Sequence, residues 1–94
     1  MVVTVRFIGP LRSISGKSQI TLEHEGAISL REALREIVER HPQIRRALFD
    51  SELEDPRPNI LTLVNGKEIS VLNGLETILK NGDEVVLVPV LHGG

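Results

Sequence analysis

Alternating apolar and polar positions predict two strands at the start of the chain. Residues 3–8 show the period of two expected of a strand with one buried face, and Gly9-Pro10 ends the run. After a connection over residues 11–17, the alternation returns over residues 19–23. The two strands are expected to form a hairpin. The apolar members of the two alternations are Val3, Val5, Phe7, Ile20 and Leu22.

The apolar spacing changes to a helical one after residue 28. Ser29 followed by Glu32 forms a capping box, in which the serine accepts from the N3 amide and the glutamate reaches back to the cap. His41-Pro42 ends the helix, because the residue before proline avoids helical geometry. A further short helical turn is expected over residues 43–49. The buried side of the main helix is predicted to carry Leu30, Ala33, Leu34, Ile37 and Val38.

The second half of the chain predicts three more strands. Residues 60–64 form an apolar run, and Asn65-Gly66 is the strongest short hairpin signal, leading into a short strand over residues 67–69. One helical turn is expected over residues 75–79, and the last strand over residues 84–90. The predicted fold class is α+β: a mixed sheet with one main helix packed across one face.

Composition fits a single domain over residues 1–94, because a chain of this length with 40% apolar residues buries roughly 60 to 70% of its unfolded surface. The chain has no cysteine, which excludes disulfides, thiolate metal sites and a cysteine nucleophile. A net charge of -2 and only two aromatic residues argue against nucleic acid as a partner. Nothing resembles a leader or a membrane span. A cytoplasmic protein is expected.

Several motifs suggest chemistry that the rest of the sequence does not support. Gly16-Lys17-Ser18 is similar to the end of a phosphate-binding loop, but Leu11 stands where the first glycine belongs and a strand is expected to follow. The acidic segment 50–58 lacks the spacing of a calcium loop and is interpreted as solvated. The three histidines lack metal-ligand spacing, so no metal is expected. Arg40, Arg45 and Arg46 are interpreted as a solvated helix face rather than a basic binding patch.

The end of the chain, Leu91-His92-Gly93-Gly94, is the strongest functional signal. Two terminal glycines present a backbone carboxylate that no side chain obstructs. With a reference pKa of roughly 3.5, such a carboxylate is an anion at neutral pH and a poor electrophile until another agent activates it. Residues 91–94 are therefore expected to form a flexible tail that serves as a substrate, and the alternative is a frayed end without function.

The motifs together resemble the ubiquitin-like sulfur carriers. The resemblance is closest to the MoaD-like small subunit of molybdopterin synthase and more distant to ThiS, the carrier of the thiamine pathway. It implies a β-grasp (ubiquitin-like) fold over nearly the whole chain. The residues that carry it are Phe7, Leu11-Arg12, Gly16, Val64-Asn65-Gly66, Leu79, Gly82-Asp83-Glu84-Val85, Pro89 and Gly93-Gly94.

This resemblance implies a non-catalytic sulfur carrier that binds no cofactor of its own. A MoeB-like enzyme, related to the ubiquitin-activating enzymes, would use ATP to adenylate the carboxylate of Gly94, which is then converted to a thiocarboxylate. In the molybdopterin branch a MoaE-like large subunit supplies the catalytic residues. Gly93 and Gly94 would fit its channel, and Leu91 and His92 would lie just behind them in the tail. His92 is expected to stay solvated rather than contact the channel mouth.

Two other functions remain open. Many members of the molybdopterin branch have two prolines before the end of the chain, whereas this chain has only Pro89 there. Its ending, Leu91-His92-Gly93-Gly94, resembles that of the ubiquitin-related modifier, which donates sulfur to transfer RNA and can be conjugated to lysines. The third alternative is an interaction module with an inert tail.

A partner surface is expected on the sheet face that the single helix leaves uncovered. Phe7, Leu63 and Leu87 are the residues assigned to it, continuing into the tail. Alternation alone leaves open which of these side chains face outward.

Overall fold

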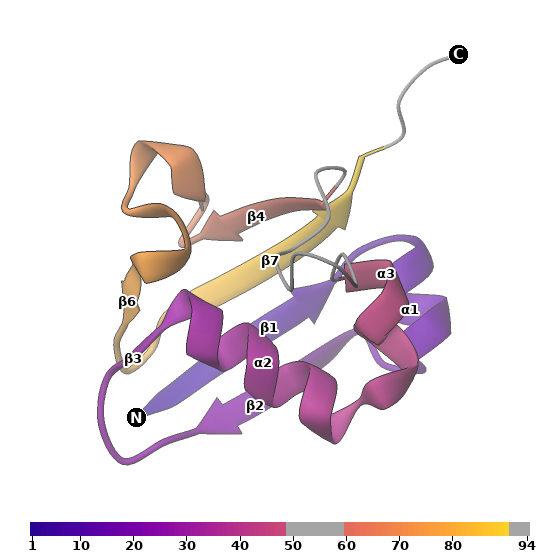
Figure 1. Ribbon diagram of the computed structural model, residues 1–94, viewed down its shortest axis with the longest axis horizontal. Coiled ribbons are helices and arrows are strands. Elements are labelled where there is room, and N and C mark those ends of the chain that lie inside the picture. Colours follow the sequence, from indigo (N-terminus) through magenta and orange to yellow (C-terminus); the bar gives the residue numbers. More distant parts are fainter. Residues whose placement is uncertain (49–59, 91–94) are drawn as a thin grey trace.

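A five-stranded sheet with one long helix across one face forms the body of the protein (Figure 1). The computed structural model describes residues 1–48 and 60–90. The strands follow the order β2-β1-β7-β4-β5. Their bounds are Val2–Phe7 for β1, Gln19–Glu23 for β2, Ile60–Val64 for β4, Lys67–Glu68 for β5 and Glu84–Pro89 for β7.

The first and last strands lie side by side in the middle of the sheet. β1 and β2 pair antiparallel, which confirms the predicted hairpin. β1 and β7 pair parallel, with Phe7 opposite Leu87, while β4 pairs antiparallel with the other edge of β7. β7 is the central strand and is hydrogen-bonded on both sides, so the chain reaches residue 90 from the middle of the sheet.

Helix α2 spans Leu30–Arg40 and begins where the capping box predicted. The Oγ of Ser29 accepts a hydrogen bond from the backbone N–H of Glu32 at 3.2 Å. At the other end the N–H of His41 donates to the carbonyl of Ile37, and the next turn, η1 (Pro42–Ile44), begins at the proline. The short α3 (Arg45–Leu48) continues it, so the predicted helical turn after Pro42 is confirmed within the described residues.

The core lies between α2 and the inward side of the sheet. The alternating apolar residues of β1 and β2 and the predicted buried residues of α2 are all buried. The short elements around the sheet and α2 also contribute buried residues to this core. The largest fully buried side chains are Phe7, Leu11, Leu22, Leu30, Leu34, Ile37, Ile44, Leu48, Leu79 and Leu87.

The connection between β1 and β2 contains a helix that was predicted as irregular. Helix α1 spans Pro10–Ser15, with proline in its first turn and Gly16 at its C-cap in the left-handed region at φ 76°. The N–H of Gly16 donates to the carbonyl of Arg12 at 2.8 Å. Proline at the start and glycine after the end are a helix signature, and burial of Leu11 stabilises this single short stretch.

The hairpin at Asn65-Gly66 is confirmed, with φ of 51° at Asn65 and 83° at Gly66. Beyond it the helical turn predicted over residues 75–79 is wrong in its bounds. Two 3-10 turns, η2 (Ile69–Val71) and η3 (Gly74–Glu76), come first. Strand β6 (Ile78–Leu79) then pairs with β3 (Ile28–Ser29). Leu79 is extended because it pairs with Ile28, and its side chain is fully buried in the core.

Candidate functional site

The structure fixes the base of the C-terminal tail. The N–H of Ile8 donates to the carbonyl of Leu87 at 3.1 Å, and Pro89 lies opposite Ile60 in the register of β4 and β7. The predicted site residues Leu91, His92, Gly93 and Gly94 lie outside the described residues. What precedes them is a strand held by β1 as far as Leu87 and by β4 as far as Pro89. The tail therefore starts from a fixed position relative to the rest of the sheet.

An apolar strip runs along the face of the sheet that α2 does not cover. Leu61 lies opposite Val88 and Leu63 lies opposite Val86, and all four are partly buried. Their neighbours along each strand point into the core, so these four point away from it. Val90, two residues after Val88, is 42% exposed. We call these five residues the outer strip. It leads along β7 to the base of the tail.

The outer strip corrects the partner surface predicted from sequence. Leu63 belongs to it, but Phe7 is 1% exposed and Leu87 is 0% exposed, so their assignment to an exposed face is wrong. Phe7 has the same parity along β1 as the buried Val3 and Val5, a signal that the alternation already contained. In β7 the run of apolar residues on both faces hides the parity of Leu87, and its pairing with β1 fixes it.

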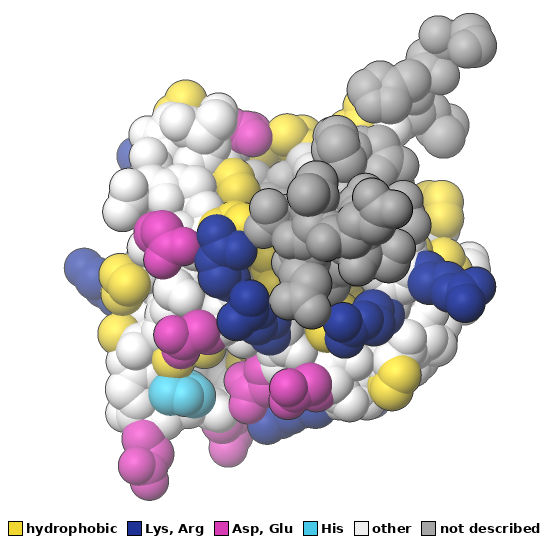
Figure 2. Space-filling view, in the orientation of Figure 1, with side chains coloured by type: hydrophobic (Ala, Val, Ile, Leu, Met, Phe, Trp, Pro, Cys, Tyr) yellow, Lys and Arg dark blue, Asp and Glu magenta, His cyan; other side chains and the backbone are white. Residues whose placement is uncertain are grey.

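One exposed ion pair joins the two middle strands, β1 and β7. Arg6 on β1 lies 3.9 Å from Glu84 on β7, with both side chains about half exposed, so the pair contributes little to stability. On the opposite, helix-bearing face, side chains of both signs are interspersed over α2 (Figure 2). There Arg40 pairs with Glu36 at 3.2 Å. Arg40, Arg45 and Arg46 are exposed, as the sequence predicted for a solvated helix face.

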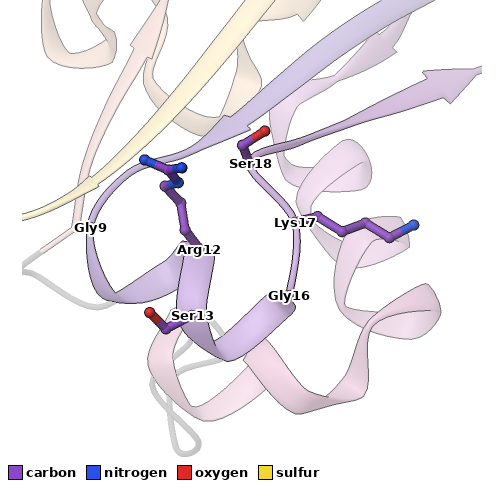
Figure 3. A pocket seen from close by; sticks show the side chains of 6 residues that line it. All are labelled: Gly9, Arg12, Ser13, Gly16, Lys17 and Ser18. Carbon is purple, nitrogen blue, oxygen red and sulfur yellow. The ribbon is translucent and has the colours of Figure 1, made fainter.

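A hollow of about 520 Å³ lies beside α1 (Figure 3) and contains the Gly16-Lys17-Ser18 motif. Arg12 and Ser18 lie on the same side of it, whereas the side chain of Lys17 points away. The residues after Ser18 form β2, which confirms the predicted strand. A phosphate bound at this motif would therefore not meet the helix N-terminus that a phosphate-binding loop uses.

The described part of the chain offers neither a metal site nor a membrane-spanning helix. Within residues 1–48 and 60–90, no group of three or more His, Asp or Glu side chains is placed to hold a metal ion. His24 instead places its Nδ1 2.9 Å from the carbonyl oxygen of Gly26 in a local turn. In the same ranges no helix is long and apolar enough to cross a membrane.

Comparison with known proteins places these features in a family. The sequence profile of the ThiS family matches residues 5–94. Ubiquitin-related modifier 1 from Schizosaccharomyces pombe is 31% identical over 100 residues, and the match covers all of both chains. The full-length match includes the segment of residues 91–94.

Solved structures give the same result for the fold. The solution structure of small archaeal modifier protein 1 from Methanosarcina acetivorans superposes with a TM-score of 0.86 at 28% identity, covering 99% of this chain and 96% of that one. Molybdopterin converting factor subunit 1 from Pyrococcus furiosus has a TM-score of 0.76 at 22% identity, covering 97% of this chain and 99% of that one, and therefore shows the fold alone. The chain adopts the β-grasp fold and belongs to the ThiS family of ubiquitin-like sulfur carriers.

Proposed function

We propose that this protein carries sulfur as a thiocarboxylate on Gly94. The observation that supports the proposal most is the family match through residue 94, which joins a Gly-Gly ending to a β-grasp body. A partner enzyme of the ubiquitin-activating class, MoeB-like, would transfer AMP from ATP to the carboxylate and release pyrophosphate. A sulfur donor then displaces AMP and leaves sulfur in place of one carboxyl oxygen.

The fold contributes position rather than catalysis. Adenylation makes the carbonyl carbon of Gly94 electrophilic, and every later bond change takes place at that carbon or at the sulfur attached to it. The chain has no cysteine and supplies only the backbone carboxylate as the reacting group. β7, paired on both sides, fixes where the tail begins, and Gly93 and Gly94 let it enter a passage too narrow for a Cβ.

The outer strip is the proposed contact for the activating partner. Leu61, Leu63, Val86 and Val88 form cross-strand apolar pairs that are partly exposed, and Val90 extends them to the tail. Burying this apolar surface against a partner is favourable and would place the tail at the edge of the interface. A partner that binds here holds the sheet while the carboxylate reaches the reaction centre.

Two functions are candidates for the loaded carrier. In the first, it acts as a ubiquitin-related modifier, which donates its sulfur to transfer RNA or has its activated tail joined to lysines. Full-length similarity to ubiquitin-related modifier 1 favours it, as does the ending Leu91-His92-Gly93-Gly94. In the second, it donates its sulfur to molybdopterin, as the MoaD-like small subunit beside a MoaE-like large subunit. The motifs of the body favour that candidate.

Adenylation is tested by the ATP–pyrophosphate exchange that a cognate activating enzyme catalyses when the carrier is added. We expect exchange with the full chain and none with a chain that lacks Gly94, because the latter presents Gly93 one residue short of the reaction centre. A second, unrelated carrier that the same enzyme accepts controls for enzyme activity. If the enzyme catalyses exchange with the control carrier but not with this chain, the result would favour the interaction module with an inert tail.

The acceptor is tested by offering the thiocarboxylated protein three substrates in parallel. These are transfer RNA with its thiolation enzyme, a mixture of lysine-containing proteins, and a MoaE-like subunit with its pterin precursor. We expect loss of sulfur, or covalent attachment, with the first or second. Turnover only with the MoaE-like subunit would assign the molybdopterin branch instead.

A further inference from the structure

Three Asn-Gly dipeptides lie in the second half of the chain: Asn65-Gly66, Asn73-Gly74 and Asn81-Gly82. At such a pair the backbone nitrogen of glycine can attack the side-chain carbonyl carbon of asparagine. Ammonia leaves, a five-membered succinimide forms, and water opens it to aspartate or isoaspartate. Glycine favours the reaction because it has no side chain to hinder the attack. The sequence alone therefore makes all three sites equally susceptible.

Hydrogen bonds hold the side chains of two of these asparagines. The Oδ1 of Asn65 accepts from the N–H of Glu84 at 2.9 Å, and its Nδ2 donates to the Oδ1 of Asp83 at 2.9 Å. The Oδ1 of Asn81 accepts from the N–H of Val2 at 2.8 Å. These bonds must break before either side chain can turn toward the following nitrogen.

At Asn81 the attacking nitrogen is held as well. The N–H of Gly82 donates to the carbonyl of Val2 at 2.8 Å, so the residues of this turn are tied to β1 through both reacting groups. The reaction requires that nitrogen to lose its proton, and a proton engaged in a hydrogen bond is harder to remove. Asn81-Gly82 is thus the most strongly protected pair.

Asn73-Gly74 has neither kind of protection. Asn73 is exposed, and among the hydrogen bonds of residues 1–48 and 60–90 none involves its side-chain amide or the N–H of Gly74. The backbone N–H of Asn73 donates to the Oγ1 of Thr77, and its carbonyl accepts from Glu76, so the bonds present leave both reacting groups free. A Cβ added at Gly74 would meet no atom within 4 Å.

Steric space does not separate the three sites, since a Cβ added at Gly66 or Gly82 would also meet nothing within 4 Å. The hydrogen bonds of the two reacting groups do separate them. We propose that Asn73 is a modification site, at which the folded protein loses ammonia and gains water without any enzyme to become aspartate or isoaspartate. Asn65 and Asn81 in the same chain are protected by their hydrogen bonds.

The modification would place a new carboxylate close to Glu76, the residue that pairs with Arg31 of α2 at 3.0 Å. Isoaspartate would also lengthen the backbone by one methylene between Asn73 and Gly74. This segment follows β5, at the end of the sheet where β7 begins, whereas the tail leaves from the other end of β7 (Figure 1). We therefore expect the change to leave loading of sulfur on Gly94 unaffected.

The test is to age the folded full chain in mildly alkaline buffer prepared with ¹⁸O-labelled water. Peptide mass spectrometry then finds the label, because hydrolysis of the succinimide adds one oxygen from solvent. We expect Asn73 to react at least about fivefold faster than Asn65 or Asn81, the ratio for breaking one hydrogen bond of ordinary net strength first. In denaturant all three should react at comparable rates.

The matched control is Asn73→Gln, which keeps an amide but forms the larger ring far more slowly, so the early label should disappear. Reaction of Asn65 or Asn81 as fast as Asn73 in the folded chain would overturn the proposal. So would a preference for Asn73 that persists in denaturant. Because the readout is label at an internal residue, the result is independent of whether Gly94 accepts sulfur.

Discussion

Leu63 and Leu87 lie on neighbouring strands but on opposite faces of the sheet, so truncating each to alanine separates packing from partner binding. Leu87 is fully buried, and Leu87→Ala should lower the free energy of unfolding by about 2–5 kcal/mol, the lost transfer energy plus a cavity. Leu63 is partly buried on the outer strip. The same change there should cost about 1 kcal/mol, because only part of the side chain leaves water on folding.

Binding to the activating enzyme should respond in the opposite order. If the outer strip is the contact, Leu63→Ala should weaken binding by about 1–2 kcal/mol, which is roughly tenfold in Kd. Leu87→Ala should leave the affinity of the folded fraction unchanged, since its side chain does not reach the surface. Val71→Ala is the matched control, because Val71 is 72% exposed. It belongs to η2, which lies near the start of β7, whereas the tail follows the end of that strand.

Urea unfolding followed by circular dichroism gives the stabilities, and titration calorimetry gives the affinities. Equal destabilisation by Leu63→Ala and Leu87→Ala would contradict the placement of Leu63 on the outer face of the sheet. Binding of Leu63→Ala as tight as that of Val71→Ala would rule out the outer strip as the contact.

Three further predictions concern single residues. Ser29→Ala should cost about 1 kcal/mol of unfolding free energy because the N–H of Glu32 loses its acceptor; an unchanged urea midpoint would contradict this. Gly66→Ala should cost about 1–2 kcal/mol, since φ is 83° there, and equal stability in the same assay would show that the turn relaxes. His92→Ser should change kcat/KM for thiocarboxylate formation by less than about 1 kcal/mol in transition-state terms; a loss of tenfold or more would make His92 a recognition residue.

Local signals in the sequence were sufficient for most of the elements. The N–H of Glu32 bonds to Ser29 three residues earlier, and the hairpin at Asn65-Gly66 pairs Val64 with Lys67, so neighbouring residues specify both features. Helix α1 also had such signals, Pro10 and Gly16, but six residues are too few to show helical periodicity.

Long-range pairing decided what the sequence left open. Leu79 was predicted at the end of a helical turn, and its pairing with Ile28, far away in the chain, makes it a strand residue instead. Leu87 lies in an apolar run, and its pairing with the neighbouring strands β1 and β4 fixes which face it is on. The residues of the candidate partner surface could therefore be identified only from the structure. The tail residue Gly94 could be identified from sequence alone, by its position and chemistry.

Intact-mass spectrometry of the protein after incubation with ATP, its activating enzyme and a sulfur donor tests the central claim most directly. We expect a species in which one oxygen is replaced by sulfur, with tandem fragmentation placing the sulfur on Gly94. The chain lacking Gly94 should keep its thermal stability and show no such species, because a terminal residue contributes little packing. A full-length chain that stays unmodified by an enzyme active on another carrier would contradict the account.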